Sequence, residues 1–373
     1  MENNNKTLNV PNLRFPEFSG EWEYHELQSI APKISSGKDK PNNEGTVVLY
    51  GSTGIMGHTT TESYKSEIVI VARVGANAGQ LQLVDIPCGV TDNALVVDAK
   101  SWNKYVFYYL QHFNLNKLVF GSGQPLITGG MLKKIKIWAG NNVERNKIVH
   151  LLSLMEERVD TQKKVIEDLK RLKYAISKQI FAQEPIDWNR LDTLFSKGKA
   201  GGTPTSTNKE FYNGDIPFLS INDITKQGKY IRYTENHLSQ SGLDISSAWI
   251  VPQHSLIMSM YASVGLVTIN EVPITTSQAM FAMQLKDKDL LDYLYYYLSY
   301  FKYRHIHKFL ETGTQSNINA DIVRGIMIPD YGSSFNIQIA STLQIIDAKI
   351  DNELAILEQF NSQKSHLLSQ MFI

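Results

Sequence analysis

Residues 143–181 read VERNKIVHLLSLMEERVDTQKKVIEDLKRLKYAISKQIF, and residues 334–372 read SFNIQIASTLQIIDAKIDNELAILEQFNSQKSHLLSQMF. The two stretches start 191 residues apart, and their apolar positions follow alternating steps of four and three, the heptad seam of a coiled coil. Even the polar interruptions are shared, because Gln162 corresponds to Glu353 and Lys173 to Lys364. The seam positions are Ile148, Leu152, Met155, Val159, Ile166, Leu169, Ile176 and Ile180, then Ile339, Leu343, Ile346, Ile350, Leu357, Phe360, Leu367 and Met371.

Each stretch predicts a helix of about 40 residues, or about 60 Å if it is helical throughout. A helix of that length cannot bury its own apolar seam. We therefore expect the two helices to pair with each other in an antiparallel coiled coil within one chain. The alternative is that each helix packs on its neighbouring domain as an ordinary amphipathic helix. Because the alternation persists over about four heptads, the pattern favours the pair.

The segments outside the helices predict two similar mixed domains, so the expected class is α+β. We place an N-terminal head at 1–142, a first helix at 143–184, a second head at 185–334 and a second helix at 335–373. Head one has expected strands at Thr46–Tyr50, Glu67–Arg73, Ala94–Val97 and Ile135–Trp138, with a helix at Ser101–Phe113. Head two has strands at Ile216–Ile221, Ser255–Met260 and Ile326–Ile328, with a helix at Lys286–Tyr300.

Two further stretches align between the heads. YVFYYL (105–110) matches YLYYYL (293–298), and VARVGANAGQ (71–80) matches IMSMYASVGL (257–266), which places Arg73 opposite Ser259. The tyrosines invite comparison with the base-stacking platforms of single-strand binders. Their spacing of i, i+3, i+4 puts them on one helix face, which instead favours packing against the head's own sheet. They are Tyr105, Tyr108 and Tyr109 in head one, and Tyr293, Tyr296 and Tyr297 in head two.

The composition limits the class of protein. The 373 residues contain 37 basic and 37 acidic side chains, which disfavours a self-sufficient DNA binder. If the chain binds DNA, either a partner supplies much of the phosphate neutralisation or the Lys and Arg side chains cluster on one face. Cys88 is the single cysteine, which excludes an internal disulfide and fits a reducing compartment. The polar N-terminus does not resemble a signal peptide, and no apolar run approaches the roughly 20 residues that cross a bilayer. We expect a cytoplasmic protein without a membrane partner.

The sequence offers no catalytic residues and no metal site. It has no GxGxxG after a strand, no phosphate-binding P-loop, no HExxH or CxxC spacing, and no Asn/Asp-Pro-Pro-Tyr/Phe segment. GSTG (51–54) and GANAG (75–79) could cradle a phosphate, but glycines there are more often turn residues with positive φ. The chain is therefore not expected to be an enzyme or to hold a cofactor of its own.

Several segments, in this order along the whole chain, resemble the DNA-specificity subunit of type I restriction-modification systems. They are LRFPEFSGEWEYHEL (13–27), VGANAGQ (74–80), KRLKYAISKQIF (170–181), IPFLSINDI (216–224), ASVG (262–265), TGTQSNIN (312–319) and NSQKSHLLSQMF (361–372). Head one departs from the pattern, with VVLYGSTGI (47–55) in place of a segment like IPFLSINDI. Residue roles therefore transfer less directly to head one.

The resemblance implies a target-recognition domain in each head, reading one half of a split target in double-stranded DNA. It implies that the paired helices set the gap between the halves and dock two methyltransferase subunits, and through them restriction subunits. S-adenosylmethionine, ATP and Mg would then belong to the partner subunits only. Two rival classes remain: a protein-interaction scaffold built on a coiled coil, and a fused methyltransferase, which would need an S-adenosylmethionine site.

Candidate DNA-contacting side chains are the amides, hydroxyls and cations of the predicted loops, because such groups read base edges or bind phosphates. In head one they are Lys38, Lys40, Ser52, Arg73, Asn77 and Gln124. In head two they are Lys197, Lys199, Thr203, Asn222, Tyr261, Ser263, Gln315 and Asn317. The lysines could equally be solvated surface charges, and Gln315 and Asn317 could cap a turn. Arg73 could instead form a salt bridge with a neighbouring carboxylate.

Overall fold

The computed structural model describes residues 9–118, 125–309 and 317–373. The chain forms two compact units, one made of Met1–Lys164 with Leu354–Ile373 and the other of Val165–Glu353. Each unit contains one head together with parts of two long helices, α4 (Asn142–Phe181) and α10 (Ser333–Gln370). Each helix therefore starts in the unit of its own repeat and ends in the unit of the other repeat.

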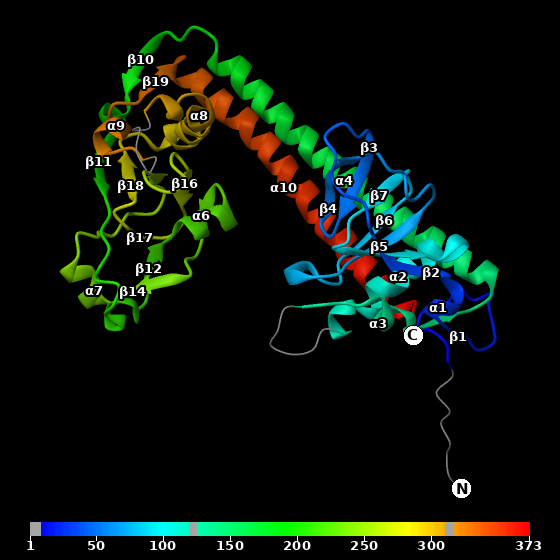
Figure 1. The fold of residues 1–373 in the computed structure, drawn as a ribbon. Coiled ribbons are helices and arrows are strands. Elements are labelled where there is room, and N and C mark those ends of the chain that lie inside the picture. The colour runs from blue at the N-terminus through cyan, green and yellow to red at the C-terminus, as the bar shows by residue number, and fades with distance from the viewer. Residues whose placement is uncertain (1–8, 119–124, 310–316) are drawn as a thin grey trace. The chain divides into compact units, whose positions relative to one another are not determined.

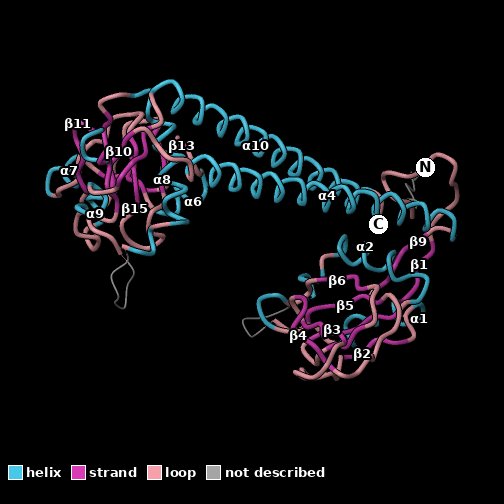
Figure 2. The backbone as a smooth tube through the Cα atoms, turned by 90° about the horizontal axis from the view of Figure 1, so that it is seen from above, coloured by secondary structure: helices cyan, strands magenta, loops and turns pink. Residues whose placement is uncertain are grey.

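In the described residues of the first unit, the head contains three small sheets, and most of their strands are labelled in Figure 1. The four-stranded sheet carries the core, because β5 and β8 are buried almost along their whole length and α2 packs over β5 and β6 (Figure 2). The sheets, in spatial order, are β1 (Glu23–Glu26) with β9 (Lys136–Ala139); β2 (Lys33–Ser36), β8 (Ala94–Asp98), β5 (Ile68–Ala72), β6 (Leu81–Val84); and β4 (Gly54–Thr59), β3 (Val47–Gly51), β7 (Cys88–Val90). The α-helices are α1 (Leu27–Ile30), α2 (Asn103–Phe113) and α3 (Gly129–Lys133).

The head of the second unit repeats this topology and extends it. Its sheets are β10 (Asp187–Arg190) with β19 (Met327–Asp330); β11 (Phe195–Ala200), β18 (Met280–Leu285), β15 (Leu256–Ser259), β16 (Val267–Asn270), β13 (Tyr230–Ile231); and β14 (Asn236–Leu238), β12 (Ile216–Leu219), β17 (Thr275–Thr276). Its α-helices are α5 (Leu191–Leu194), α6 (Ile221–Gln227), α7 (Gln240–Ile245), α8 (Leu291–Arg304) and α9 (Ala320–Arg324). Each head has one three-stranded sheet among its described residues, and one pair of strands in that sheet is parallel: β3 with β7 in head one and β12 with β17 in head two.

Several predicted boundaries are wrong. The strand expected at Ile216–Ile221 ends at Leu219, because Ser220 caps α6, and the first long helix ends at Phe181 and not at residue 184. The helix expected at Lys286–Tyr300 begins only at Leu291 and continues to Arg304. The Asp287 carboxylate accepts the backbone N–H of Asp289 at 2.9 Å, which starts a short 3-10 turn over Lys288–Leu290 instead of an α-helix. An aspartate that bonds its own backbone two residues on favours such a turn over a helix interior.

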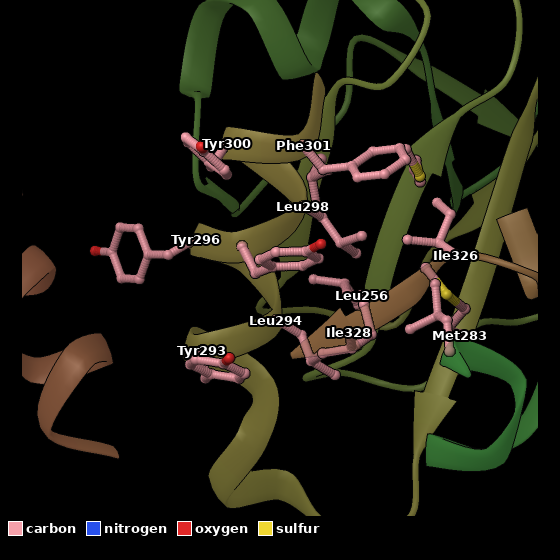
Figure 3. Packing of buried hydrophobic residues seen from close by; sticks show 14 of the residues in the cluster. Leu256, Met283, Tyr293, Leu294, Tyr296, Leu298, Tyr300, Phe301, Ile326 and Ile328 are labelled. Atoms are coloured by element: carbon pink, nitrogen blue, oxygen red, sulfur yellow. The ribbon is translucent and has the colours of Figure 1, made fainter. Parts of the chain in front are cut away.

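The tyrosines are buried, as their spacing predicts, and they also receive the long helices. Leu294 and Leu298 of α8 point toward the sheet side, near Leu256 and Ile328, whereas Tyr296 points the other way (Figure 3). We call the tyrosine-lined site in each head the aromatic socket. Phe181, at the end of α4, packs with Tyr293, Tyr297 and Tyr300, and Phe372, just beyond α10, packs with Tyr105, Tyr109 and His112. Each head thus holds the end of the other repeat's helix.

The predicted seam residues are among the less exposed positions of both long helices. Each of the sixteen seam residues is buried or half-buried. Residues near the ends of the helices, such as Ile148 and Ile339, join the hydrophobic cores of the heads. Met155 and Val159 are also buried, at 8% and 6% exposure, but outside those cores. Both sequence interpretations therefore hold in part: the helices pack on the heads at their ends and on each other farther along.

The lysines that interrupt the seam make matched polar contacts. Lys364 Nζ lies 2.6 Å from Glu156 Oε1, and the Tyr108 hydroxyl donates to Glu156 Oε2 at 2.8 Å. Burial raises the pKa of the Tyr108 hydroxyl, so it stays protonated and donates. The second unit has the corresponding set, with Lys173 Nζ at 2.5 Å from Asp347 Oδ1 and the Tyr296 hydroxyl at 2.9 Å from Asp347 Oδ2. We call each set a tyrosine–carboxylate–lysine cluster. Each one joins a head to both long helices.

Candidate nucleic-acid interface

In head one, a turn of residues 91–93, which we call turn A, connects the loop of Lys38 and Lys40, the end of β3 and Arg73. The Thr91 N–H donates to Tyr50 O at 2.9 Å, and Asn93 O accepts the Arg73 N–H at 3.1 Å. The preceding strand residue, Val90, exchanges two bonds with Asp39, since Asp39 N–H donates to Val90 O and the Asp39 carboxylate accepts the Val90 N–H. Lys38 and Lys40, which flank Asp39, are exposed. Turn A therefore links the loop of Lys38 and Lys40 to Arg73.

Ser52 and Asn77 lie on loops that approach the same region. Gln82 of β6 donates to Gly51 O at 3.0 Å and to Ser52 O at 3.3 Å, which holds the β3–β4 turn against β6. Asn77 lies in the β5–β6 connection, where its side-chain oxygen accepts a bond from Gln80 at 3.1 Å. Gln124 lies outside the described residues.

In head two, the corresponding turn B comprises residues 277–279. The Met260 N–H donates to Ala279 O at 2.7 Å, as Arg73 does to Asn93 in head one. The exposed Thr203 hydroxyl contacts the Gln278 side chain of turn B. Met260 O accepts the Ile318 N–H at 3.0 Å, so Asn317 lies beside the same loop as the exposed Tyr261 and Ser263.

The predicted alignment of the β5–β6 and β15–β16 connections is wrong by one residue. Ala72 and Gly79 make the same backbone bonds in head one as Ser259 and Gly265 make in head two. Both glycines have positive φ, 92° and 79°, which fixes the end of each connection. Arg73 is therefore equivalent to Met260 and not to Ser259. An alignment without gaps could not show this equivalence, because the connection in head one is one residue longer than the connection in head two.

Other candidates are placed apart from the turns or are already engaged. The Asn222 amide donates to Glu235 at 2.8 Å, on the surface beside α6. Lys197 and Lys199 lie on β11, and Lys197 Nζ sits 4.1 Å from the centre of the Trp249 ring. A cation–π contact therefore competes with the predicted phosphate contact at Lys197. Gln315 lies outside the described residues. The salt bridge considered for Arg73 is not present among the described side chains.

The sequence interpretation missed the turns themselves. Asp92, Asn93 and Gln278 are exposed and sit at the centre of the clusters just described. A usable signal existed, because polar turn residues stand directly before the buried strands β8 and β18. The two turns present carboxylate, amide and hydroxyl groups, which are the groups that read base edges.

The described residues contain neither a candidate metal site nor a candidate membrane span. No group of three or more His, Cys, Asp or Glu side chains there could hold a metal ion. In the same part of the chain, no helix combines the length and apolar character needed to cross a membrane.

Comparison with solved structures supports this fold. The S subunit of a type I restriction-modification system from M. genitalium superposes with a TM-score of 0.62 at 15% identity, over 98% of this chain and 99% of that one. A chain from a study of complex assembly and conformational transition of the type I R-M system gives a TM-score of 0.60 at 16% identity, over 94% and 97%.

Sequence comparisons point to the same family. The specificity subunit of type I restriction enzyme HindI from Haemophilus influenzae is 33% identical over 119 residues, 32% of this chain and 26% of that subunit. The MjaIX specificity subunit from Methanocaldococcus jannaschii is 27% identical over 175 residues, 45% of this chain and 40% of that subunit. The chain thus matches less than half the length of either relative.

The model of the type I restriction modification DNA specificity domain matches twice, at residues 19–171 and 185–361. These two matches include both heads and most of both long helices. The chain belongs to the type I restriction-modification DNA specificity family, with one copy of the domain in each repeat.

Proposed function

We propose that this chain is the DNA-sequence specificity subunit of a type I restriction-modification complex, and that each head binds one half of a bipartite target. The observation that carries the proposal is the contrast between the heads. The backbone contacts that hold the two turns recur in both heads, whereas turn A and turn B present different side chains at equivalent places. Two similar domains that present different polar groups are suited to reading two different sequences.

The paired helices would set the gap between the two half-sites and dock two adenine-methyltransferase subunits. Support comes from the repeat, because two copies of one partner need two equivalent surfaces. The restriction subunits would join through those partners. The chain would supply no catalysis, and S-adenosylmethionine, ATP and Mg would be bound by the partners.

The charge of the chain fits this division of labour. Its 37 basic and 37 acidic side chains balance, so the chain alone has little excess charge to neutralise phosphates. Phosphate neutralisation dominates non-specific affinity and makes it depend on salt. We therefore expect tight, salt-dependent and sequence-selective binding only in the complex with methyltransferase subunits. A pure protein scaffold would show neither salt-dependent nor sequence-selective binding of DNA.

The test is co-expression with the methyltransferase subunit of the same operon, followed by genome-wide mapping of N6-methyladenine. The expected result is a split motif, with two short defined halves around a gap of fixed length. Unmodified DNA despite a well-formed complex would contradict the proposal and favour the scaffold. Binding of S-adenosylmethionine by the isolated chain would instead favour a fused methyltransferase.

A further inference from the structure

We infer that Arg73 reads a guanine in the half-site bound by head one, an inference that rests on the proposed function. Arg73 directly follows β5, whose residues are no more than 1% exposed. Its backbone is held on both sides, because its N–H donates to Asn93 O at 3.1 Å and its carbonyl accepts the Ile127 N–H at 2.8 Å. The half-buried side chain therefore leaves a fixed point of the frame, next to turn A.

The guanidinium of Arg73 has no partner among the described residues. Its Nε is buried and has no hydrogen-bond acceptor there, and no carboxylate lies within ion-pair distance. A buried donor without an acceptor is unfavourable, so the guanidinium gains from a ligand that supplies acceptors. In head two, three of the four arginines are paired, Arg190 with Asp192, Arg232 with Glu271 and Arg324 with Asp321, and the fourth, Arg304, is exposed at the end of α8.

The chemistry of the group selects the base. A guanidinium presents a planar fork of donors, and guanine O6 and N7 form the matching pair of acceptors in the major groove. Head one has two arginines, and the other one, Arg14, is already paired with Glu144 at 2.7 Å, which leaves Arg73 as the guanidinium able to make that fork. The equivalent residue in head two is Met260, which is 3% exposed. A guanine contact at this position of the frame is therefore possible in head one and not in head two.

The experiment uses Arg73→Met in the complex with methyltransferase subunits, with N6-methyladenine mapping as the measurement. Methionine is chosen because the frame of head two already accommodates it at this place. We expect one guanine position in one half of the motif to become degenerate, with the other half unchanged. A bidentate pair contributes about 1–3 kcal/mol of discrimination, so preference at that position should fall about 5- to 150-fold.

Two further variants keep the test decisive. Arg73→Lys retains the charge but not the fork, so it should also weaken the preference for guanine, and it replaces Arg73→Met if that protein does not fold. Lys38→Met removes an exposed charge from the loop that is bonded to Val90, and it should lower methylation at all sites without changing the motif.

The contrary results are distinct. If Arg73→Met and Arg73→Lys both leave the motif unchanged, Arg73 makes no base contact. If Arg73→Met lowers methylation equally at every site, Arg73 binds a phosphate and does not read a base. Either result overturns the inference while the wild-type split motif still supports the proposed function. A wild-type complex without any split motif would instead remove the proposed function itself.

Discussion

The frame of the molecule is duplicated closely, whereas the two turns are not. Both aromatic sockets hold a phenylalanine from the other repeat, and both tyrosine–carboxylate–lysine clusters have the same composition apart from Glu156 against Asp347. At the turns, Arg73 is replaced by Met260 and the adjoining loops differ in length. The difference indicates that the contacts between the heads and the long helices are the same in both repeats, whereas the side chains at turn A and turn B differ.

Breaking a long helix should have the largest effect. Proline at Val159 or Ile350, which are 6% and 7% exposed, removes a helix hydrogen bond and clashes with the preceding turn, for about 3 kcal/mol or more. We expect each change to abolish assembly with methyltransferase subunits and methylation together, as measured by co-purification and methylation mapping. Val143→Pro is the control, because proline is tolerated in the first turn of α4. Assembly that survives both interior prolines would contradict the paired-helix account.

Emptying the aromatic sockets should have the next largest effect. Phe181→Ala and Phe372→Ala each remove a ring that is at most 8% exposed, and each should lower the free energy of unfolding by about 3–5 kcal/mol. Denaturant unfolding of both variants measures this. Phe335→Ala, at a residue 41% exposed, should change stability by less than about 0.5 kcal/mol. A large loss of stability in only one of the two variants would contradict the view that the two aromatic sockets contribute equally.

The tyrosine–carboxylate–lysine clusters should contribute less. Lys173→Met and Lys364→Met each leave a half-buried carboxylate without its cation, which should cost about 1–3 kcal/mol. Double-mutant cycles with Asp347→Asn and Glu156→Gln should give similar coupling energies in the two repeats. Lys163→Met tests an exposed ion pair and should have almost no effect. Unequal couplings would show that only one cluster stabilises the helix pairing.

The smallest expected effect concerns pH and head one alone. Burial raises the pKa of the Cys88 thiol from its ordinary value of 9.0 to about 11. Because the unfolded thiol ionises first, Cys88 contributes stability below pH 9 that is lost as the pH rises toward 11. Denaturant unfolding of Cys88→Ala between pH 7 and 11 should therefore show a shallower alkaline loss than wild type. Identical slopes would mean that the thiol does not contribute.

Sequence periodicity predicted the frame better than it predicted its connections. The seam followed from alternating apolar steps, because a buried helix face must repeat with the period of the helix. The sequence shows an apolar residue at the end of each long helix, Phe181 and Phe372, but its periodicity does not predict which hydrophobic core each ring joins. Their docking in the other repeat's head is a long-range contact that only the fold reveals.

The candidate interface was predictable only in outline. Several of the predicted loops lie beside turn A and turn B, but Asn222 and Lys197 are engaged by Glu235 and Trp249. Turn residues such as Gln278 were missed because a polar turn before a strand has the same appearance whether or not it binds a ligand. The alignment was wrong by one residue at Arg73 because the two loops differ in length, and nothing in their sequences indicates where the extra residue lies.

The most direct test of the account replaces head two, residues 185–334, by a second copy of head one while both long helices are kept. A second copy of head one should pack on the long helices at the position of head two, because the aromatic socket and the tyrosine–carboxylate–lysine cluster occur in both repeats. Mapping of N6-methyladenine in the reassembled complex should show one half of the split motif unchanged and the other replaced by a second copy of it. If both halves changed, or if the original motif persisted, specificity would not reside separately in each head.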